Sequence, residues 1–100
     1  MERISLIIPC YNESSPLRDT YNELKRVLEK EEIISTYSYE LIFVNDGSND
    51  DTINIIKELA LNDETVKYIS FTRNFGKEAG MLAGLNNATG DIVIIIDADL

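Results

Sequence analysis

The sequence contains no histidine and a single cysteine, Cys10. A zinc site made of cysteine and histidine is therefore excluded, and any metal ion would have to be held by oxygen ligands. One cysteine cannot form an internal disulfide, so the sequence does not call for an oxidising compartment. Because no histidine is present to activate it, Cys10 is expected to be a small packing residue and not a nucleophile.

Basic residues are also scarce: the chain has 9 lysines and arginines against 18 aspartates and glutamates, for a net charge of -9. This acidity argues against binding to nucleic acid or to an anionic membrane surface. A phosphate-bearing ligand would need a local cationic site or a divalent metal ion. No apolar run approaches the roughly 20 residues that span a bilayer, and no signal peptide is recognisable. We therefore expect the chain to be cytoplasmic.

Short apolar runs alternate with amphipathic segments along the chain. Strands are expected at residues 4–8, 40–44, 66–71 and 92–96, and helices over about 16–32, from a cap at 50 or 51 to about 61, and over 77–87 or 88. Pro9 should end the first strand, and Gly90 should cap the third helix. The first, second and fourth strands are continuously apolar, which is typical of strands buried on both faces of a parallel sheet. The sequence therefore predicts an α/β fold with an open, doubly wound, mostly parallel sheet and flanking helices.

The most apolar run, residues 92–96, lies almost at the end of the sequence. A buried parallel strand needs cover on both faces, and too few residues follow this strand to cover one of them. We therefore interpret residues 1–100 as the truncated N-terminal part of a larger domain. The exposed last strand is expected to allow the fragment to self-associate.

Charged side chains follow all four expected strands, at the sheet edge where open α/β folds bind their ligands. Glu13 follows the first strand, Asp46 the second, Arg73 and Lys77 the third, and Asp97 and Asp99 the fourth. The beginnings of the strands show no such concentration. This convergence predicts a binding site more strongly than any one motif does.

The tripeptide Asp97-Ala98-Asp99 is the first candidate for binding a metal ion. In an extended segment its two carboxylates would point to the same side, about 6.5 Å apart along the strand. Magnesium commonly binds one or two carboxylates together with the phosphates of a substrate. A turn that ends the strand, with a carboxylate capping a helix, is the alternative.

The other residues at this edge each allow two interpretations. Asp46 can accept hydrogen bonds from a base or ribose, or Asp46 and Gly47 can form only a turn. Tyr11 can stack on a base while Glu13 holds a ribose hydroxyl, or both can belong to a solvated loop. Lys77, at the start of the third helix, can form an anion site with Arg73 and the helix dipole, or both can form surface salt bridges.

Gly80 and Gly84 are expected to allow close packing of the third helix on the sheet. No glycine stands in the turn after the first strand. This absence argues against a dinucleotide-binding domain of the G-x-G-x-x-G type.

Three segments together resemble family 2 glycosyltransferases of the GT-A fold, a Rossmann-like architecture. They are Ile7-Ile8-Pro9-Cys10-Tyr11-Asn12-Glu13, Val44-Asn45-Asp46-Gly47-Ser48-Asn49-Asp50-Asp51-Thr52 and Asp97-Ala98-Asp99-Leu100. A fourth segment, Phe71-Thr72-Arg73-Asn74-Phe75-Gly76-Lys77-Glu78-Ala79-Gly80, is similar to the polyprenyl-phosphate branch, which includes bactoprenol glucosyltransferases and dolichol-phosphate mannose synthases.

The resemblance implies a role for each matching position. Pro9, Tyr11, Glu13, Val44 and Asp46 would line the nucleoside pocket, and Asp97, Ala98 and Asp99 would hold the diphosphate and sugar through Mg2+ or Mn2+. The donor would be a nucleotide sugar of the UDP-glucose or GDP-mannose type. The acceptor would be a polyprenyl phosphate, glycosylated with inversion at the cytoplasmic face of the membrane.

No catalytic residue is assigned within the fragment, which is expected to be inactive by itself. Three alternatives remain open. They are a non-catalytic module that binds nucleotide and metal, a glycosyltransferase with a polysaccharide acceptor, and a receiver-like domain phosphorylated at Asp46 or Asp97.

Overall fold

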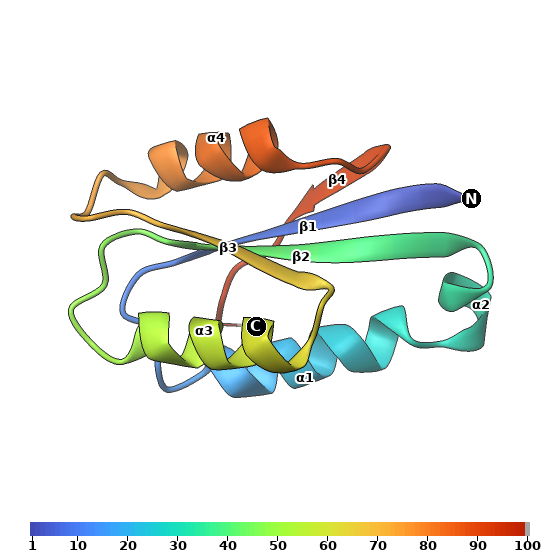
Figure 1. The fold of residues 1–100 in the computed structure, drawn as a ribbon, viewed down its shortest axis with the longest axis horizontal. Helices are drawn as coiled ribbons and strands as arrows, with labels where there is room; N and C mark the ends of the chain where they lie inside the picture. The colour runs from blue at the N-terminus through green and yellow to red at the C-terminus, as the bar shows by residue number, and fades with distance from the viewer. Residues whose placement is uncertain (100) are drawn as a thin grey trace.

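Four parallel strands alternate with helices along residues 1–99, the part of the chain that the computed structural model describes (Figure 1). In chain order the elements are β1 (Glu2–Cys10), α1 (Leu17–Leu28), α2 (Glu31–Ile34), β2 (Tyr37–Asn45), α3 (Thr52–Asn62), β3 (Val66–Ser70), α4 (Lys77–Asn87) and β4 (Ile92–Ile95). Leu100, the last residue of the third resembling segment, lies outside the described residues. No helix within residues 1–99 combines the length and apolarity needed to span a membrane.

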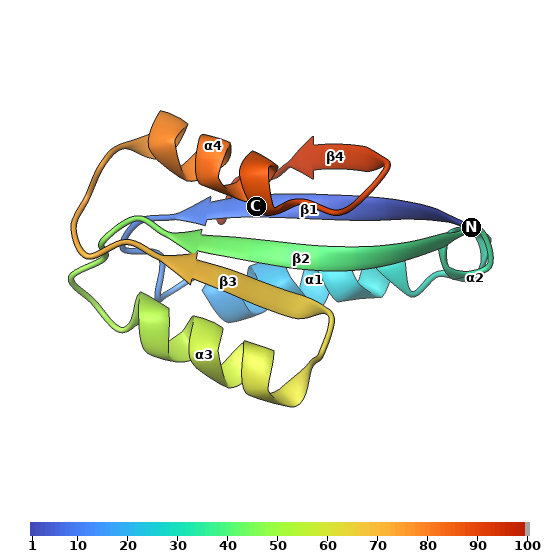
Figure 2. The ribbon, with the colours of Figure 1, turned by 45° about the horizontal axis from the view of Figure 1, so that its top comes forward.

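The strands form one parallel sheet in the order β3-β2-β1-β4. β1 pairs with β2 from Glu2↔Tyr37 to Cys10↔Asn45, and its other edge pairs with β4 from Ile4↔Ile92 to Ile7↔Ile95. Helices α1 and α3 cover one face of the sheet and α4 covers the other (Figure 2). The predicted doubly wound α/β fold is therefore confirmed. The chain adds β2 and β3 on one side of β1 and then returns to add β4 on the other, so the strand order reverses between β1 and β4.

The central strands β1 and β2 are buried on both faces, as their apolar runs predicted. One layer of the core joins alternate residues of these strands to α1 and α3, through Ile4, Leu6, Ile8, Leu41, Phe43, Leu17, Leu24, Ile55 and Ile56. The opposite layer, beneath α4, contains Ile7, Ile42 and Val44. A Cβ atom on Gly84 would lie 2.4 Å from Cγ2 of Ile7, so the close packing predicted for this glycine is confirmed.

The fourth strand is less buried than its apolar sequence predicted. β4 lies at an edge of the sheet, and its residues Val93, Ile94 and Ile95 remain 39%, 40% and 42% exposed. An apolar run of this kind indicates burial on both faces, which these residues do not have, whereas the exposure expected for the last strand is confirmed for residues 93–95. Self-association through this strand stays a prediction.

β1 and β2 both extend beyond the apolar runs from which they were predicted. Pro9 lies within β1, paired with Val44, and does not end the strand as predicted. Carbonyls of β1 alternate in direction, since the Ile7 carbonyl accepts from Ile96 beside β4 and the Cys10 carbonyl accepts from Asp46 beside β2. The nitrogen of Pro9 therefore faces the β4 side, where strand pairing has already ended, so its missing N–H leaves no ladder bond unmade.

The predicted helix over residues 16–32 is two helices. Lys30 has extended backbone angles, φ -63° and ψ 143°, which separate α1 from the single turn of α2. Gly90 does not cap α4, whose C-cap is Ala88. The Gly90 backbone N–H donates to Ser5 Oγ over 2.8 Å, and a Cβ atom on Gly90 would lie 2.5 Å from the same oxygen. Gly90 is therefore needed for close approach to β1.

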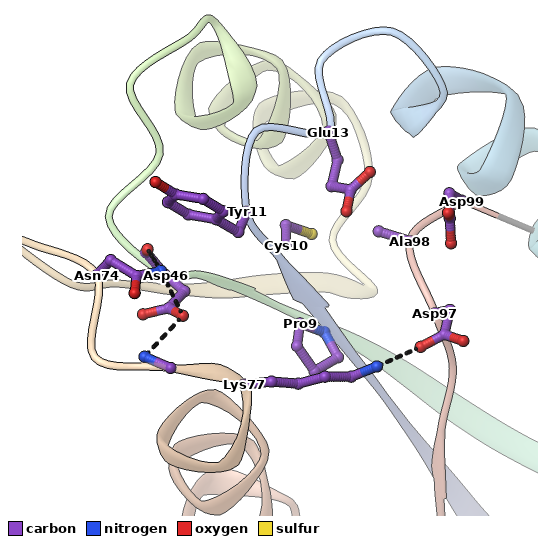
Figure 3. A pocket seen from close by; sticks show the side chains of 11 residues that line it. Pro9, Cys10, Tyr11, Glu13, Asp46, Asn74, Lys77, Asp97, Ala98 and Asp99 are labelled. Carbon is purple, nitrogen blue, oxygen red and sulfur yellow. Dashed lines mark hydrogen bonds and ion pairs between the residues drawn. The ribbon is translucent and has the colours of Figure 1, made fainter.

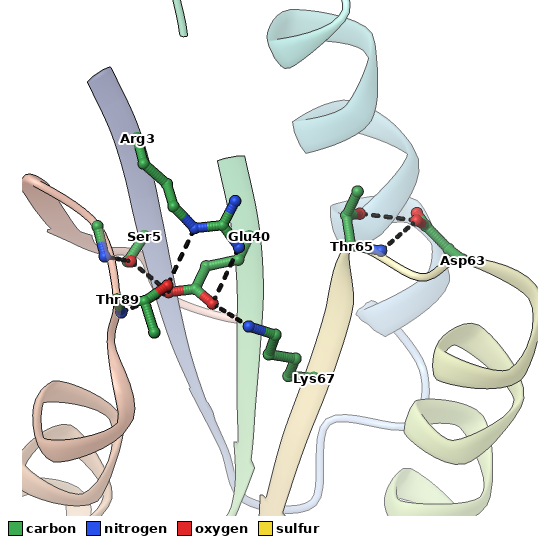
Figure 4. Close-up of polar contacts among 8 residues, drawn as sticks. Arg3, Ser5, Glu40, Asp63, Thr65, Lys67 and Thr89 are labelled. Carbon is green, nitrogen blue, oxygen red and sulfur yellow. Dashed lines mark hydrogen bonds and ion pairs between the residues drawn. The ribbon is translucent and has the colours of Figure 1, made fainter. Parts of the chain in front are cut away.

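A fully buried carboxylate, Glu40 of β2, joins three strands and the α4–β4 loop (Figure 4). It accepts hydrogen bonds from Ser5 Oγ at 2.5 Å, Lys67 Nζ at 2.6 Å and the Thr89 backbone N–H at 2.7 Å. Burial raises the pKa of Glu40, but these hydrogen bonds outweigh burial and lower it to about 2. The carboxylate is therefore held in its ionised form.

Candidate functional site

An open cavity of about 540 Å³ lies at the carboxyl edge of the sheet, where the strand order reverses between β1 and β4 (Figure 3). It is lined by Pro9, Cys10, Tyr11, Glu13, Asp46, Asn74, Gly76, Lys77, Asp97, Ala98 and Asp99. Its volume is within the range of small-molecule sites, and reversal points of this kind are where open α/β sheets bind ligands. The sequence predicted this edge from the charged residues that follow each strand.

All the residues predicted for the site line this cavity, apart from Val44 and Arg73. Val44 is fully buried and packs with Ile7 and Ile42 on the face of the sheet that α4 covers. The structure therefore does not bring it to the cavity wall. Arg73, the second predicted cation, lies outside the cavity with its guanidinium carbon 4.5 Å from the centre of the Phe75 ring. Among the described residues that line the cavity, Lys77 is the one with a positive charge.

Tyr11 and Glu13 are held in place by the loop that follows β2 and by the first residue of α3. The backbone N–H of Glu13 donates to Thr52 Oγ1 over 3.0 Å, and the Asn12 side-chain oxygen accepts from the Asn49 N–H at 2.7 Å. Asn12 has a positive φ of 53°, which turns the chain between the two side chains. Tyr11 stays 43% exposed at the cavity, a position from which its ring can stack on a ligand.

The segment that contains Asp97 and Asp99 is a turn and not an extended strand. β4 ends at Ile95, and Ala98 and Asp99 form the turn. Ala98 is buried, and its carbonyl accepts a 2.6 Å hydrogen bond from Thr20 Oγ1 of α1. The prediction of two carboxylates on one side of an extended segment is therefore wrong in its geometry. Both side chains nevertheless line the cavity, because the turn anchored at Ala98 carries them there.

Three acidic side chains share this cavity edge with one lysine. Burial raises the pKa of Glu13, and repulsion from Asp99, Asp50 and Asp97 raises it further, whereas Lys77 lowers it. Lys77 Nζ donates to Asp97 Oδ1 over 2.8 Å. The cavity edge thus carries an excess of negative charge that an added cation would offset.

The Asp46 carboxylate is buried and is enclosed by the segment that precedes α4. Its side chain is 4% exposed and accepts hydrogen bonds from the backbone N–H groups of Phe75 and Gly76, at 2.7 and 3.1 Å. Gly47 has a φ of 67°, and a Cβ there would lie 2.1 Å from the Arg73 carbonyl carbon. The predicted turn at Gly47 is therefore confirmed.

Asn74 and Gly76 also line the cavity but were not predicted as site residues. Asn74 Nδ2 donates to Asp46 Oδ2 over 3.0 Å, and Gly76 has a φ of 102° and precedes α4. The signal that could have found them is the clustering of asparagine and glycine directly before the predicted helix.

Cys10 is a packing residue, as predicted. It is 1% exposed, and its thiol contacts the Ile8 carbonyl at 3.3 Å. Burial, followed by the charge of Glu13, raises the pKa of Cys10 to about 12, so the thiolate is disfavoured.

The carboxylates suit a hard divalent cation, which prefers oxygen ligands. Within residues 1–99 no group of three acidic or cysteine side chains forms a complete metal site. Asp97 and Asp99 would therefore supply part of a coordination shell, and the phosphates of a ligand would supply the rest.

Comparison with known proteins gives consistent matches over nearly the whole chain. The model of the family described as "Glycosyl transferase family 2" matches residues 5–100. The chain is 50% identical over 98 residues to the "Prophage bactoprenol glucosyl transferase homolog" of Escherichia coli (strain K12), and 49% identical over 98 residues to the "Bactoprenol glucosyl transferase" of Shigella phage SfX. Each alignment covers 98% of this chain and 31% of the relative.

Among solved structures, the mannosyltransferase PcManGT from Pyrobaculum calidifontis, in complex with GDP-Man and Mn2+, superposes with a TM-score of 0.82 at 25% sequence identity. The match covers 98% of this chain and 28% of that protein. The chain thus spans less than a third of the length of each of these three proteins.

Proposed function

This chain belongs to glycosyl transferase family 2, and we propose that it forms the nucleotide-sugar-binding part of an enzyme that transfers a hexose to a polyprenyl phosphate. The observation that carries this proposal is the cavity between β1 and β4, where Glu13, Asp97, Asp99 and Lys77 converge. The acceptor is suggested by the two relatives named as bactoprenol glucosyl transferases, which match 98% of the chain. The donor is of the UDP-glucose or GDP-mannose type, and the mannosyltransferase structure with GDP-Man supports this class.

Asp97 and Asp99 are the residues that would hold Mg2+ or Mn2+ in this chain. Their oxygen donors fit either ion, and the excess negative charge around Glu13 would be relieved by a cation. The solved mannosyltransferase with Mn2+ supports the use of a divalent metal in the family. Bound there with the donor, the ion would neutralise negative charge that develops on the leaving nucleoside diphosphate.

The chain's own side chains would mainly bind and orient the donor. Tyr11 offers a half-exposed ring to the base, Glu13 a carboxylate to a ribose hydroxyl, and Lys77 an ammonium group to the diphosphate. A phosphate acceptor is already anionic at neutral pH, so its attack with inversion needs no base to remove a proton. Catalysis then depends on positioning the two reactants, and we assign no catalytic residue within residues 1–99. With a lipid phosphate acceptor and a nucleotide-sugar donor, the reaction would take place at the cytoplasmic face of the membrane.

Calorimetric titration of the chain with UDP-glucose and GDP-mannose, with and without MnCl2, tests the proposal. We expect one of the two to bind only with metal, and Asp99→Ala to weaken that binding by more than about tenfold through loss of a metal ligand. Glu32→Ala is the matched control, because it removes an exposed carboxylate from α2 at the opposite end of the sheet (Figure 1). Failure of the wild-type chain to bind either nucleotide sugar would contradict the proposal.

Transfer of labelled sugar to undecaprenyl phosphate separates the proposed enzyme from the alternatives. This assay uses the longer protein that contains residues 1–100, because the chain covers less than a third of its relatives. Sugar in the lipid fraction supports a polyprenyl-phosphate acceptor. Metal-dependent binding without any transfer would favour a non-catalytic module, and transfer to a polysaccharide alone would favour the other acceptor class.

A further inference from the structure

The turn that carries Asp97 and Asp99 is held from two sides. On the side of α4, Lys77 Nζ donates to Asp97 Oδ1 over 2.8 Å, and both side chains are largely exposed. On the side of α1, Thr20 Oγ1 donates to the Ala98 carbonyl over 2.6 Å, and both residues are only 2% exposed. An exposed ion pair is weak, whereas a buried hydrogen bond is shielded from competing water. The contact with α1 is therefore the one that can fix the turn.

Helix propensity does not explain why a threonine stands at position 20. Threonine is a poor helix former, and inside a helix its hydroxyl often bonds to the carbonyl four residues earlier. Here the Pro16 carbonyl accepts the Thr20 backbone N–H at 2.9 Å, and the hydroxyl reaches a residue 78 positions away. No other donor within residues 1–99 contacts the Ala98 carbonyl. Because a buried carbonyl without a donor is costly, the Thr20 hydroxyl supplies a bond that no neighbouring group supplies.

The first turn of α1 joins two loops of the cavity. Its first residue, Leu17, donates its backbone N–H to the Glu13 carbonyl over 3.1 Å. The chain that follows β4 runs to the face of the sheet that α1 covers (Figure 1), where Ala98 packs in the same core layer as Leu17. This turn of helix therefore contacts both the loop that carries Glu13 and the turn that carries Asp97 and Asp99.

We propose that Thr20 is a positioning residue, which holds the Ala98 carbonyl and so keeps Asp97 and Asp99 where a divalent metal ion and the diphosphate would meet them. The inference rests on the proposed function, because the metal ion and the diphosphate belong to it. Thr20 does not line the cavity and would touch neither of them. Its effect on affinity would pass entirely through the backbone of the turn.

Thr20→Val and Thr20→Ser form a matched pair of variants. Valine keeps the shape of threonine without its hydroxyl, whereas serine keeps the hydroxyl without the methyl group. We expect Thr20→Val to weaken the binding of Mn2+, and of UDP or GDP with MnCl2, by about tenfold in calorimetric titrations, as loss of a group that orients metal ligands commonly does. Thr20→Ser should bind like wild type.

A residue that only fills the core would give the opposite order. Serine would then be the worse replacement, because it leaves a small cavity where the methyl group was, and valine would be tolerated. A loss of affinity in Thr20→Ser that equals or exceeds the loss in Thr20→Val would overturn the inference, and so would wild-type affinity in Thr20→Val.

Thr36→Val is the control for removing a threonine hydroxyl that faces a backbone carbonyl. Thr36 Oγ1 lies 3.5 Å from the Glu32 carbonyl at an exposed position. It directly precedes β2, at the end of the sheet away from the cavity. Thr36→Val should leave every affinity unchanged, and amide spectra with wild-type dispersion show that each variant folds.

NMR spectroscopy of the chain without ligand separates this inference from the proposed function. In wild type, the buried Thr20 hydroxyl proton should exchange slowly enough with water to give its own resonance. The Ala98 carbonyl carbon, detected through the Asp99 amide, should shift in Thr20→Val because its hydrogen bond is lost, and should stay in place in Thr20→Ser and Thr36→Val.

These resonances need neither nucleotide nor metal. If no nucleotide binds the wild-type chain, the proposed function fails while the resonances still decide whether Thr20 holds the turn. A Thr20 hydroxyl proton that exchanges freely in wild type would overturn the inference without any variant. An Ala98 carbonyl resonance that is the same in wild type and Thr20→Val would do so as well.

Discussion

Lys77 Nζ lies 2.8 Å from Asp97 Oδ1, so a cation of the chain itself contacts one of the two aspartates proposed to hold a metal ion. The contact raises the pKa of Lys77, first through the hydrogen bond and then through the charge of Asp97. Both side chains are largely exposed, at 63% and 66%. Exposed ion pairs are weak, so Asp97 can release Lys77 and bind a metal ion at little cost in free energy.

Lys77→Met should therefore change metal and nucleotide affinity in opposite directions. Without nucleotide, Mn2+ should bind up to about threefold more tightly, because Asp97 is no longer paired. With Mn2+ present, UDP or GDP should bind about fivefold more weakly, because the diphosphate loses a charged donor. Calorimetric titrations with MnCl2 alone and then with nucleotide measure both effects.

Lys57→Met is the control for this exchange, since it removes the same charge from an exposed position on α3 that does not line the cavity. It should change neither affinity. Weaker Mn2+ binding in Lys77→Met than in Lys57→Met would show that the lysine does not compete with the metal for Asp97.

Gly80 and Gly84 of α4 offer a paired test of helix–sheet packing. A Cβ on Gly84 would lie 2.4 Å from Cγ2 of the fully buried Ile7, whereas a Cβ on Gly80 would lie 3.6 Å from Pro9 and 3.7 Å from Val44. Gly84→Ala should lower the free energy of unfolding by about 1–3 kcal/mol, the usual cost of overpacking a core. Gly80→Ala should raise it by up to about 1 kcal/mol, because alanine is the better helix former.

Urea unfolding followed by circular dichroism measures both variants under the same conditions. The opposite signs are the essential result, because a general intolerance of side chains on this helix face would make both variants less stable. Equal destabilisation would mean that α4 sits closer to the sheet at Gly80 than the structure places it.

Local patterns were enough to predict where the strands lie but not where they end. The run from Ile92 to Ile95 is apolar throughout, and so is the core of β2. The predicted strand 40–44 missed residues 37–39, the beginning of β2, because Glu40 interrupts the apolar pattern and reads as a polar boundary. Its burial depends on Ser5, Lys67 and Thr89, which come from other strands and loops, and such partners cannot be inferred from neighbouring residues.

The same limit explains which site residues could be predicted. Ligands bind beyond the carboxyl ends of parallel strands, and this rule alone places Glu13, Asp97 and Lys77 at one edge of the sheet. Val44 was assigned to the nucleoside pocket from the family resemblance. A valine inside a strand, next to a buried neighbour, more often packs in the core. The engagement of Asp46 by residues 74–76 depends on how closely two loops approach, which spacing along the chain does not encode.

Glu40 gives the chain a pH dependence that can be isolated from that of the other carboxylates. Its pKa falls from 4.5 in the unfolded chain to about 2 in the folded chain. A depressed pKa contributes stability above the unfolded value, and that contribution is lost as the pH falls from about 4.5 to about 2. At about 1.4 kcal/mol for each pKa unit, the full contribution is about 3 kcal/mol.

Glu40→Gln should therefore cost about 3 kcal/mol of unfolding free energy near pH 6, and clearly less near pH 3, as wild-type Glu40 becomes protonated on unfolding. The pKa of Asp50 is lowered to about 2 and that of Asp63 is lowered further, but both titrate in wild type and variant alike, so the difference between the two proteins reports Glu40 alone. Glu58→Gln, at an exposed carboxylate paired with Arg18, should show no comparable pH dependence. Urea unfolding of the three proteins at both pH values is the measurement. A cost of Glu40→Gln that stays constant with pH would assign it to lost packing and geometry, and the ionised carboxylate would then contribute nothing of its own.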